Sequence, residues 1–396
     1  MVFNSLGSNY NLAYVVKSFF TSRTLGEGEK LKKFLNTKYD GKPVLLYKGR
    51  EAIKLALDLC QFPKGSRIGV NGLTCFVVYE AVVEAGCIPV YIDIDKSLNF
   101  SSKALEKVKN LKAIIIQNTL GNPVDIAEIK KYCSKNKTIL IEDLAHSVGT
   151  LYSNGMEAGK IGDFTTLSFS QDKIIDGVSG GALIVRNKKF NKGLKEIQYF
   201  DVSSIRRFKD RLYPILTYKV RCLYRIGLGR GLHFLLKKIK VLSQPIGGRD
   251  LVLYHRLPHW YSFMINYKFS SFDSELRHRR KIARIYMEII DKSLLSNDLN
   301  KNINQSSNIR YPIFTENRNG LVTYLKSHRV YVSDIWYDAP IAPRRMLAKT
   351  SYQGECPMAE QISKQILNLP THINTSAKEA TRISNLVNLW RSTNQK

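Results

Sequence analysis

Between residues 45 and 185, short apolar segments of strand type alternate with segments of helical pattern, and this alternation limits the possible folds. The helical segments cover 50–60, 75–86 and 126–136. The strand candidates are rich in Ile and Val, and several are apolar at consecutive positions: SRIGV (66–70), CIPVYIDI (87–94), KAIIIQ (112–117), TILIED (138–143), FTTLSF (164–169) and GALIV (181–185). Such strands are typical of sheets covered on both faces. The pattern predicts an α/β fold with a mainly parallel central sheet and right-handed crossovers.

The chain of 396 residues is long enough for a large domain and a second, smaller one. We expect a large domain over 1–198, a basic helical insertion over 199–260, a connecting helix within 261–304 and a small α+β domain over 305–396. The connecting helix is predicted over 270–292. The small domain is predicted from a strand in 308–315, a helix over 319–328, the strand VYVSDIW (330–336) and a closing helix over 377–390.

The net charge of +28 indicates an acidic partner or an anionic surface. Across 201–250, 12 Lys and Arg stand against 3 Asp and are interleaved with Leu, Ile, Tyr and Phe. The stretch 218–242 predicts a pair of amphipathic basic helices broken at Gly227, Gly229 and Gly231. Two interpretations stay open. The pair either packs its apolar face on the body or on a second subunit, or it contacts an anionic membrane surface or acidic ligand.

Other partners and compartments have less support in the sequence. No helix-turn-helix, zinc-finger or RNP-like motif accompanies the charge, which argues against nucleic acid. The six cysteines show no CxxC pair and no metal-ligand spacing, so we expect no metal site and reduced thiols in the cytoplasm. The first 20 residues lack a signal-peptide pattern, and no apolar run approaches the roughly 18 residues of a membrane span. We therefore expect a cytoplasmic protein, at most peripheral at the inner face of the membrane.

Chemically distinctive residues follow the predicted strands. Asp143 ends one strand and His146 stands three residues on, while Ser168 ends the next strand and Lys173 follows five residues later. Asn118, directly after the strand 112–117, is a further candidate. Because the carboxyl ends of parallel strands share one edge of the sheet, an acid, an imidazole, a hydroxyl and a lysine are predicted to converge there.

This combination suits pyridoxal 5'-phosphate. A lysine can form a Schiff base with the cofactor, and a carboxylate can hold its pyridine nitrogen protonated. The cofactor phosphate needs a hydroxyl and backbone N–H groups at a helix start. Ser168 can provide the hydroxyl, and Gly49, Arg50 and Glu51 open the predicted helix 50–60.

At this point the chain resembles a known family, the fold-type-I, pyridoxal-phosphate-dependent sugar aminotransferases often called the DegT–StrS family. The likeness covers most of the chain apart from about 199–260 and follows the family's order of motifs. It is carried by LGEGEKLKKF (25–34), YKGREAIKLAL (47–57), CIPVYIDID (87–95), LGNPVDI (120–126), IEDLAHSVGT (141–150), GKIGDFTTLSFSQDK (159–173), GVSGGALIV (177–185) and the tail 357–379. The resemblance implies an aspartate-aminotransferase-like large domain, a small C-terminal domain and a homodimer.

The resemblance also implies roles for single residues. Lys173 matches the Schiff-base lysine, which also acts as the general acid and base. Asp143 matches the partner of the pyridine nitrogen, and Ala145 the small residue beneath the ring. His146 matches the residue near the phenolic oxygen, and Ser168 matches the phosphate-binding serine.

The sequence departs from the family pattern at three places. Arg50 stands where the family has Thr or Ser, and it either binds phosphate by charge or points outward. The aromatic residue that stacks on the ring falls on Cys75 by direct matching, with Phe76 one residue away, and we favour Phe76. The family's N-x-R-M motif, which reaches the partner subunit's site, is not recognisable in 257–271.

The resemblance thus implies an aminotransferase that moves an amino group from an amino acid, by family habit glutamate, to a keto-sugar. The sugar is expected on a nucleotide or lipid diphosphate, in the biosynthesis of surface polysaccharide or another glycan. The alternative is a catalytically divergent family member that acts as a membrane-peripheral or regulatory protein.

Overall fold

The protein is described by a computed structural model over residues 1–21, 24–243 and 252–394, and its centre is a seven-stranded sheet. The strand order is β2-β9-β8-β7-β6-β3-β5. The strands are β2 (Lys42–Leu46), β3 (Arg67–Asn71), β5 (Ile88–Ile92), β6 (Leu111–Ile116), β7 (Ile139–Asp143), β8 (Phe164–Ser168) and β9 (Gly181–Val185). Neighbours from β8 to β5 are parallel, while β9 is antiparallel to both β8 and β2. The mainly parallel sheet and all six predicted strands are confirmed; the edge strand β2 was not predicted.

Helices cover this sheet, and their apolar residues form one core with it. The helices are α2 (Glu27–Tyr39), α3 (Gly49–Leu59), α4 (Phe76–Glu84), α5 (Ser102–Glu106) and α6 (Ile126–Asn136). The predicted helices 50–60, 75–86 and 126–136 correspond to α3, α4 and α6. In α3, the buried side chains Ile53, Ala56 and Leu57 recur at helical spacing and lie on the strand core.

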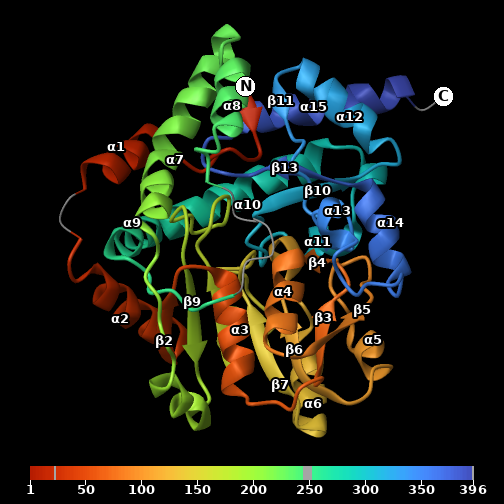
Figure 1. Cartoon of the computed structure of the whole chain (residues 1–396). Coiled ribbons are helices and arrows are strands. Elements are labelled where there is room, and N and C mark those ends of the chain that lie inside the picture. The colour runs from red at the N-terminus through yellow and green to blue at the C-terminus, as the bar shows by residue number, and fades with distance from the viewer. Residues whose placement is uncertain (22–23, 244–251, 395–396) are drawn as a thin grey trace.

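The C-terminal part forms a smaller layer above the sheet (Figure 1). The helices α9 (His259–Ser270) and α10 (Phe272–Ile289) lead into it. The helix predicted over 270–292 corresponds to α10, which begins two residues later, at Phe272, and ends at Ile289. The remaining elements are α11 (Asn297–Lys301), β10 (Arg310–Phe314), α12 (Arg318–Ser327), β11 (Val330–Tyr331), α13 (Arg344–Leu347), α14 (Pro357–Gln365), β13 (Ile366–Pro370) and α15 (Ala377–Asn394). β10 pairs with β13 in antiparallel fashion, and a second core lies between these strands and their helices.

Two short strand pairs tie distant segments together. β1 (Val2–Phe3) runs parallel to β11, and β4 (Thr74–Cys75) runs parallel to β12 (Ile341–Ala342). The prediction of a strand over all of VYVSDIW was wrong, because only Val330 and Tyr331 are paired. The residues that follow leave the strand as a loop instead.

The basic insertion folds as a helix pair, as predicted, but the pair begins at Ser204 and not at residue 218. α7 (Ser204–Leu223) and α8 (Gly229–Lys238) pack against each other, and α1 (Leu12–Phe20) packs on α7 (Figure 1). The break lies at Gly227, which has a φ of 84°, whereas Gly229 and Gly231 belong to α8 and are not breaks. The part of the predicted insertion over 244–251 lies outside the described residues. Among the helices that are described, none is long and apolar enough to cross a membrane.

Candidate active site

A cavity of about 600 Å³ opens at the carboxyl ends of β7 and β8. The strand β2 ends at the same edge, because it pairs antiparallel to β9 as β8 does. The predicted residues that line the cavity are Lys173, Ser168, His146, Cys75, Gly49 and Arg50. The sheet therefore brings most of the predicted site together, at the edge where ligands of parallel sheets bind.

Lys173 lies in the loop after β8, and its side chain faces the cavity. Its Nζ lies 4.6 Å from the centre of the Trp336 ring. Burial lowers the pKa of the Lys173 amine, and the nearby Cys75 thiol and Asp143 carboxyl oppose this effect in part. A lysine with a lowered pKa spends more of its time neutral, which is the form that acts as a nucleophile and base.

Asp143 ends β7 and is almost fully buried. Its Oδ1 accepts hydrogen bonds from the Ala145 amide at 3.0 Å and from Thr166 Oγ1 at 3.3 Å. Burial raises the pKa of the Asp143 carboxyl, while these two donors and the charge of Lys173 lower it. The hydrogen bonds from Ala145 and Thr166 thus fix the Asp143 carboxyl near Lys173, the candidate catalytic residue.

The start of α3 touches the end of β8. A Cβ atom added to Gly49 would lie 2.8 Å from Cβ of Ser168 and 3.0 Å from its Oγ. Only glycine therefore allows the first turn of α3 to approach the Ser168 hydroxyl this closely. A hydroxyl beside the backbone N–H groups of a helix start fits a phosphate group, which supports the predicted cofactor at this cavity.

Comparison with known proteins agrees with this geometry. The model of the DegT/DnrJ/EryC1/StrS aminotransferase family matches residues 28–388. The chain belongs to this family. Its members are pyridoxal-phosphate-dependent sugar aminotransferases, so the chain is assigned to that class of enzyme.

Individual relatives are distant but cover most of the chain. A pleiotropic regulatory protein of Geobacillus stearothermophilus is 24% identical over 331 residues, which is 81% of this chain and 77% of that protein. A GDP-perosamine synthase of Vibrio cholerae is 23% identical over 352 residues, 86% of this chain and 83% of that protein. Among solved structures, an aminotransferase from Psychrobacter cryohalolentis matches with a TM-score of 0.74 and 14% identity, covering 98% of both chains. Helicobacter pylori PseC, an aminotransferase involved in pseudoaminic acid biosynthesis, matches with a TM-score of 0.71 and 17% identity over 96% of both chains. These structures share the fold-type-I architecture.

The structure places Arg50 and Cys75, which depart from the family motifs, and Glu51, which was predicted to help bind the phosphate through the start of α3. Arg50 lines the cavity but forms an ion pair with the buried Glu80 of α4. Glu51 is buried and accepts hydrogen bonds from the His255 amide at 3.0 Å and the His255 ring at 3.1 Å. The Glu51 side chain therefore points away from the cavity. Only the backbone of Glu51, at the start of α3, could contact a phosphate. Cys75 lines the cavity, and burial raises the pKa of its thiol.

The preference for Phe76 as the stacking residue does not fit the structure. Phe76 is 1% exposed, packs on Tyr79 in the core and is turned away from the cavity lining. Trp336, Tyr213 and Tyr337 line the cavity, and the Trp336 ring lies parallel to the His146 imidazole with centroids 4.8 Å apart. Burial and the charge of Lys173 hold the pKa of His146 well below its usual range, so the imidazole is neutral. Trp336 belongs to the loop that we predicted as a strand.

Asn118 does not reach the cavity either. It is completely buried, its Oδ1 accepts from the Val124 amide at 2.9 Å, and its Nδ2 donates to the Tyr152 hydroxyl at 3.3 Å. Its backbone has a φ of 46°, which Asn tolerates better than most residues. Asn118 therefore supports a turn behind the site.

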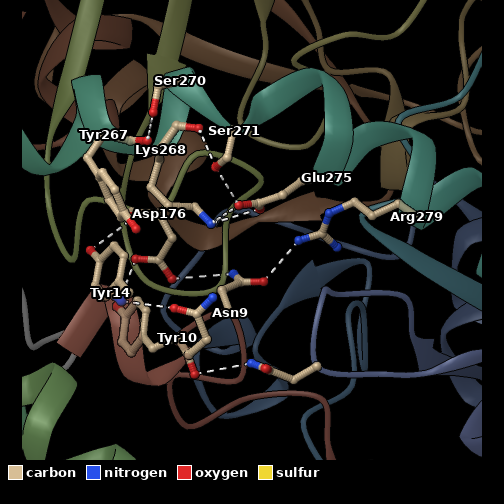
Figure 2. Close-up of polar contacts among 12 residues, drawn as sticks. Asn9, Tyr10, Tyr14, Asp176, Tyr267, Lys268, Ser270, Ser271, Glu275 and Arg279 are labelled. Carbon is tan, nitrogen blue, oxygen red and sulfur yellow. Dashed lines mark hydrogen bonds and ion pairs between the residues drawn. The ribbon is translucent and has the colours of Figure 1, made fainter. Parts of the chain in front are cut away.

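Figure 2 shows a polar network that fixes the loop carrying Lys173, which we did not predict. Asn9 Nδ2 donates to the Lys173 carbonyl at 3.0 Å, and Asn9 Oδ1 accepts from Arg279 of α10 at 2.9 Å. Asp176 accepts from the Tyr10 hydroxyl at 2.8 Å and from the backbone amide of Asp172 at 2.7 Å. Segments from the N-terminus, the lysine loop and α10 thus meet beneath the cavity.

Several charged side chains that we did not predict also line the cavity. The cationic ones are Lys48, Lys237 and Arg345, with His233 beside them, and the acidic ones are Asp172 and Asp334. Burial lowers the pKa of Lys48 to about 7 and raises that of Asp172 to about 8. Lys48 and Asp172 directly precede the predicted residues Gly49 and Lys173, whereas His233, Lys237, Asp334 and Arg345 are far from them in the sequence and belong to no motif that indicated the site.

Proposed function

We propose that the protein transfers an amino group from glutamate to a keto-sugar carried on a diphosphate, in the synthesis of a surface glycan. The observation that carries this proposal is the joint position of Lys173 and the Gly49–Ser168 contact at one cavity, with the buried Asp143 close enough to Lys173 to oppose the fall of its pKa. A nucleophilic lysine, a held carboxyl and a hydroxyl beside a helix start are what this amino transfer requires.

The residues present fit pyridoxal 5'-phosphate. When bound, this cofactor supplies an electron sink that makes a proton on the neighbouring substrate carbon acidic. Ser168 and the first turn of α3 would hold its phosphate, and Asp143 its ring nitrogen. The neutral His146 would face its ring oxygen, with Ala145 beneath the ring.

Lys173 would move the proton. Its Nζ has to accept a proton from the substrate carbon and later return it, which requires an amine that is neutral for part of the cycle. Burial provides this by lowering the pKa of Lys173. The indole of Trp336 covers the amine and limits the access of water to it.

The acceptor would enter from the side of α8 and α13. Lys237 of α8 and Arg345 of α13 line the cavity and offer positive charge to a diphosphate. Carrier-linked sugars are in keeping with the relatives, which include a GDP-perosamine synthase and, among solved structures, DesI in the presence of its TDP-sugar product. We place this activity in the cytoplasm, as the scattered cysteines suggest, and in a homodimer, as the resemblance implies.

An absorbance spectrum of the purified protein tests the proposal. We expect a visible band from the bound cofactor, and its conversion on addition of glutamate in the absence of acceptor. If the spectrum does not change with glutamate but changes with another amino acid, glutamate is not the donor. The assignment as an aminotransferase would still stand.

The alternative is a catalytically divergent, regulatory family member. It is supported by the Arg50–Glu80 ion pair at the helix start and by the relative named as a pleiotropic regulatory protein. A colourless preparation that releases no pyridoxal phosphate on denaturation, even after incubation with the cofactor, would favour it over the aminotransferase.

A further inference from the structure

Exposed apolar side chains are concentrated on α1, α7 and α8. Over the described ranges, nineteen large hydrophobic side chains are exposed, and eleven of them lie within 12–20 and 204–239. Phe20, Ile205 and Phe234 are between 70% and 75% exposed. We call the outward faces of these three helices, which pack side by side in the upper part of Figure 1, the α1–α7–α8 surface. Exposed apolar groups gathered in this way mark an interaction site.

The charge of this surface has one sign. Residues 204–239 contain ten Lys and Arg and a single acidic residue, Asp210. Asp210 is fully buried and accepts hydrogen bonds from the hydroxyls of Tyr47 and Tyr261. The charges that this stretch presents to solvent are therefore all positive.

Charge complementarity decides between the candidate occupants. A second copy docked through the same surface would bring like charges together, and the chain's net charge of +28 disfavours a match elsewhere on that copy. Nucleic acid would neutralise the cations but leave the exposed Ile and Leu side chains in water. A bilayer with anionic lipids satisfies both features, because apolar side chains enter the acyl boundary while Lys and Arg meet the headgroups.

We propose that the α1–α7–α8 surface docks on a membrane that contains anionic lipids. α8 connects this surface with the active site, since Phe234 and Leu235 are exposed while His233 and Lys237 line the cavity. Docking therefore brings α8, which forms part of the cavity wall, next to the headgroups. It follows that the acceptor sugar is carried by a lipid diphosphate, a step that rests on the proposed function.

Vesicle sedimentation with the full chain tests the docking without any need for turnover. At about 0.1 M salt, where the Debye length is about 10 Å, we expect binding to phosphatidylglycerol-containing vesicles and little to pure phosphatidylcholine. The double variant Phe19→Ser/Phe208→Ser should bind at least about tenfold more weakly, because it removes apolar area that enters the lipid. The control Ile88→Ser/Leu389→Ser changes side chains of similar exposure on other elements and should bind like the wild type.

Charge variants test the attraction between the Lys and Arg side chains of this surface and the anionic headgroups. Lys219→Glu/Arg225→Glu lies on the exposed side of the helix pair, and Lys130→Glu/Lys135→Glu makes the same change in net charge on α6. Only the first pair should weaken vesicle binding. Absence of binding to anionic vesicles, or equal losses for both pairs, would overturn the proposal. The proposal would also be overturned if Phe19→Ser/Phe208→Ser converted an oligomer to monomers and left vesicle binding unchanged. The same holds if the charge variant Lys219→Glu/Arg225→Glu lost affinity for duplex DNA but not for vesicles.

The lipid-linked acceptor is tested separately with holoenzyme. Phe19→Ser/Phe208→Ser should lower kcat/KM for a lipid-diphosphate keto-sugar in vesicles and leave that for a soluble nucleotide-linked keto-sugar unchanged. Equal kcat/KM losses for both substrates would refute this step and leave the docking result standing. Absence of amino transfer to either acceptor would count against the proposed function, again without affecting the sedimentation result.

Discussion

The side-chain amide of Asn9 donates a 3.0 Å hydrogen bond to the backbone carbonyl of Lys173, 164 positions further along the chain. The same side chain accepts from the buried Arg279, so one residue joins the lysine loop to α10. The backbone at the candidate catalytic residue is therefore positioned by the N-terminal segment.

Replacing Asn9 with Ala should destabilise the protein by about 1–3 kcal/mol, because a buried guanidinium and a carbonyl both lose a partner. The affinity for the cofactor should also fall, since the loop that carries Lys173 loses its hydrogen bond to Asn9. Asn374→Ala is the matched control: Asn374 donates to the carbonyls of Ser8 and Tyr10, in the same segment, but does not contact Lys173. Urea unfolding and cofactor titration measure the two effects. Equal losses of cofactor affinity in both variants would contradict a specific role for Asn9.

Replacing Lys173 with Ala should abolish both the visible band of the bound cofactor and turnover, because no other amine takes its place over Trp336. Lys173→Arg keeps the positive charge but has no amine that is neutral near pH 7, and it should be equally inactive. Absorbance and amino-transfer assays check both variants. Turnover that persisted in either would remove Lys173 from its assigned role.

Replacing Gly49 with Ala should weaken cofactor binding by about tenfold or more, because the new methyl group fills the contact with Ser168. Gly28→Ala is the control, since the atoms nearest to its added methyl group are 3.9 Å away and α2 tolerates Ala well. Equilibrium dialysis of pyridoxal phosphate measures the difference. Wild-type affinity in Gly49→Ala would show that the phosphate lies elsewhere.

Lys48 should make diphosphate binding depend on pH. A lysine is positive below its pKa, and burial lowers the pKa of Lys48 to about 7. The affinity for a nucleotide-diphosphate sugar should therefore fall as pH rises through 7, by up to about tenfold per unit if one proton is involved. Calorimetric titration across this range should show the slope in the wild type and a flatter profile in Lys48→Met. An identical slope in the variant would assign the dependence to another group.

The sequence predicted the strand ends and the helix start that form the site better than the aromatic and charged side chains that line its cavity. The strand ends at Asp143 and Ser168 and the start of α3 follow from local hydrophobic periodicity, which is set by residues close in the chain. Trp336 was missed because VYVSDIW has the composition of a strand, whereas the chain leaves the sheet after Tyr331. Phe76 was preferred over Cys75 by residue type, but Cys75 ends β4 at the cavity, whereas Phe76 is the first residue of α4 and its side chain is buried in the core.

The network around Asn9 could not be predicted for a different reason. Its hydrogen bonds join Asn9 to Lys173 and to Arg279, with separations of 164 and 270 residues. No local pattern in the first 14 residues indicates such partners. The basic helix pair was predicted from its composition, but its contact with the cavity through His233 and Lys237 depends on tertiary packing.

The N-terminal segment has a consequence for how the protein is made. The Phe3 carbonyl contacts the His372 ring, and Asn9 accepts from Arg279, so residues that are synthesised early find their partners among residues synthesised much later. Contacts of such long range form late in folding. A chain that stops before α10 would keep Lys173 but lack Arg279, which holds Asn9, and we therefore expect no amino transfer from it.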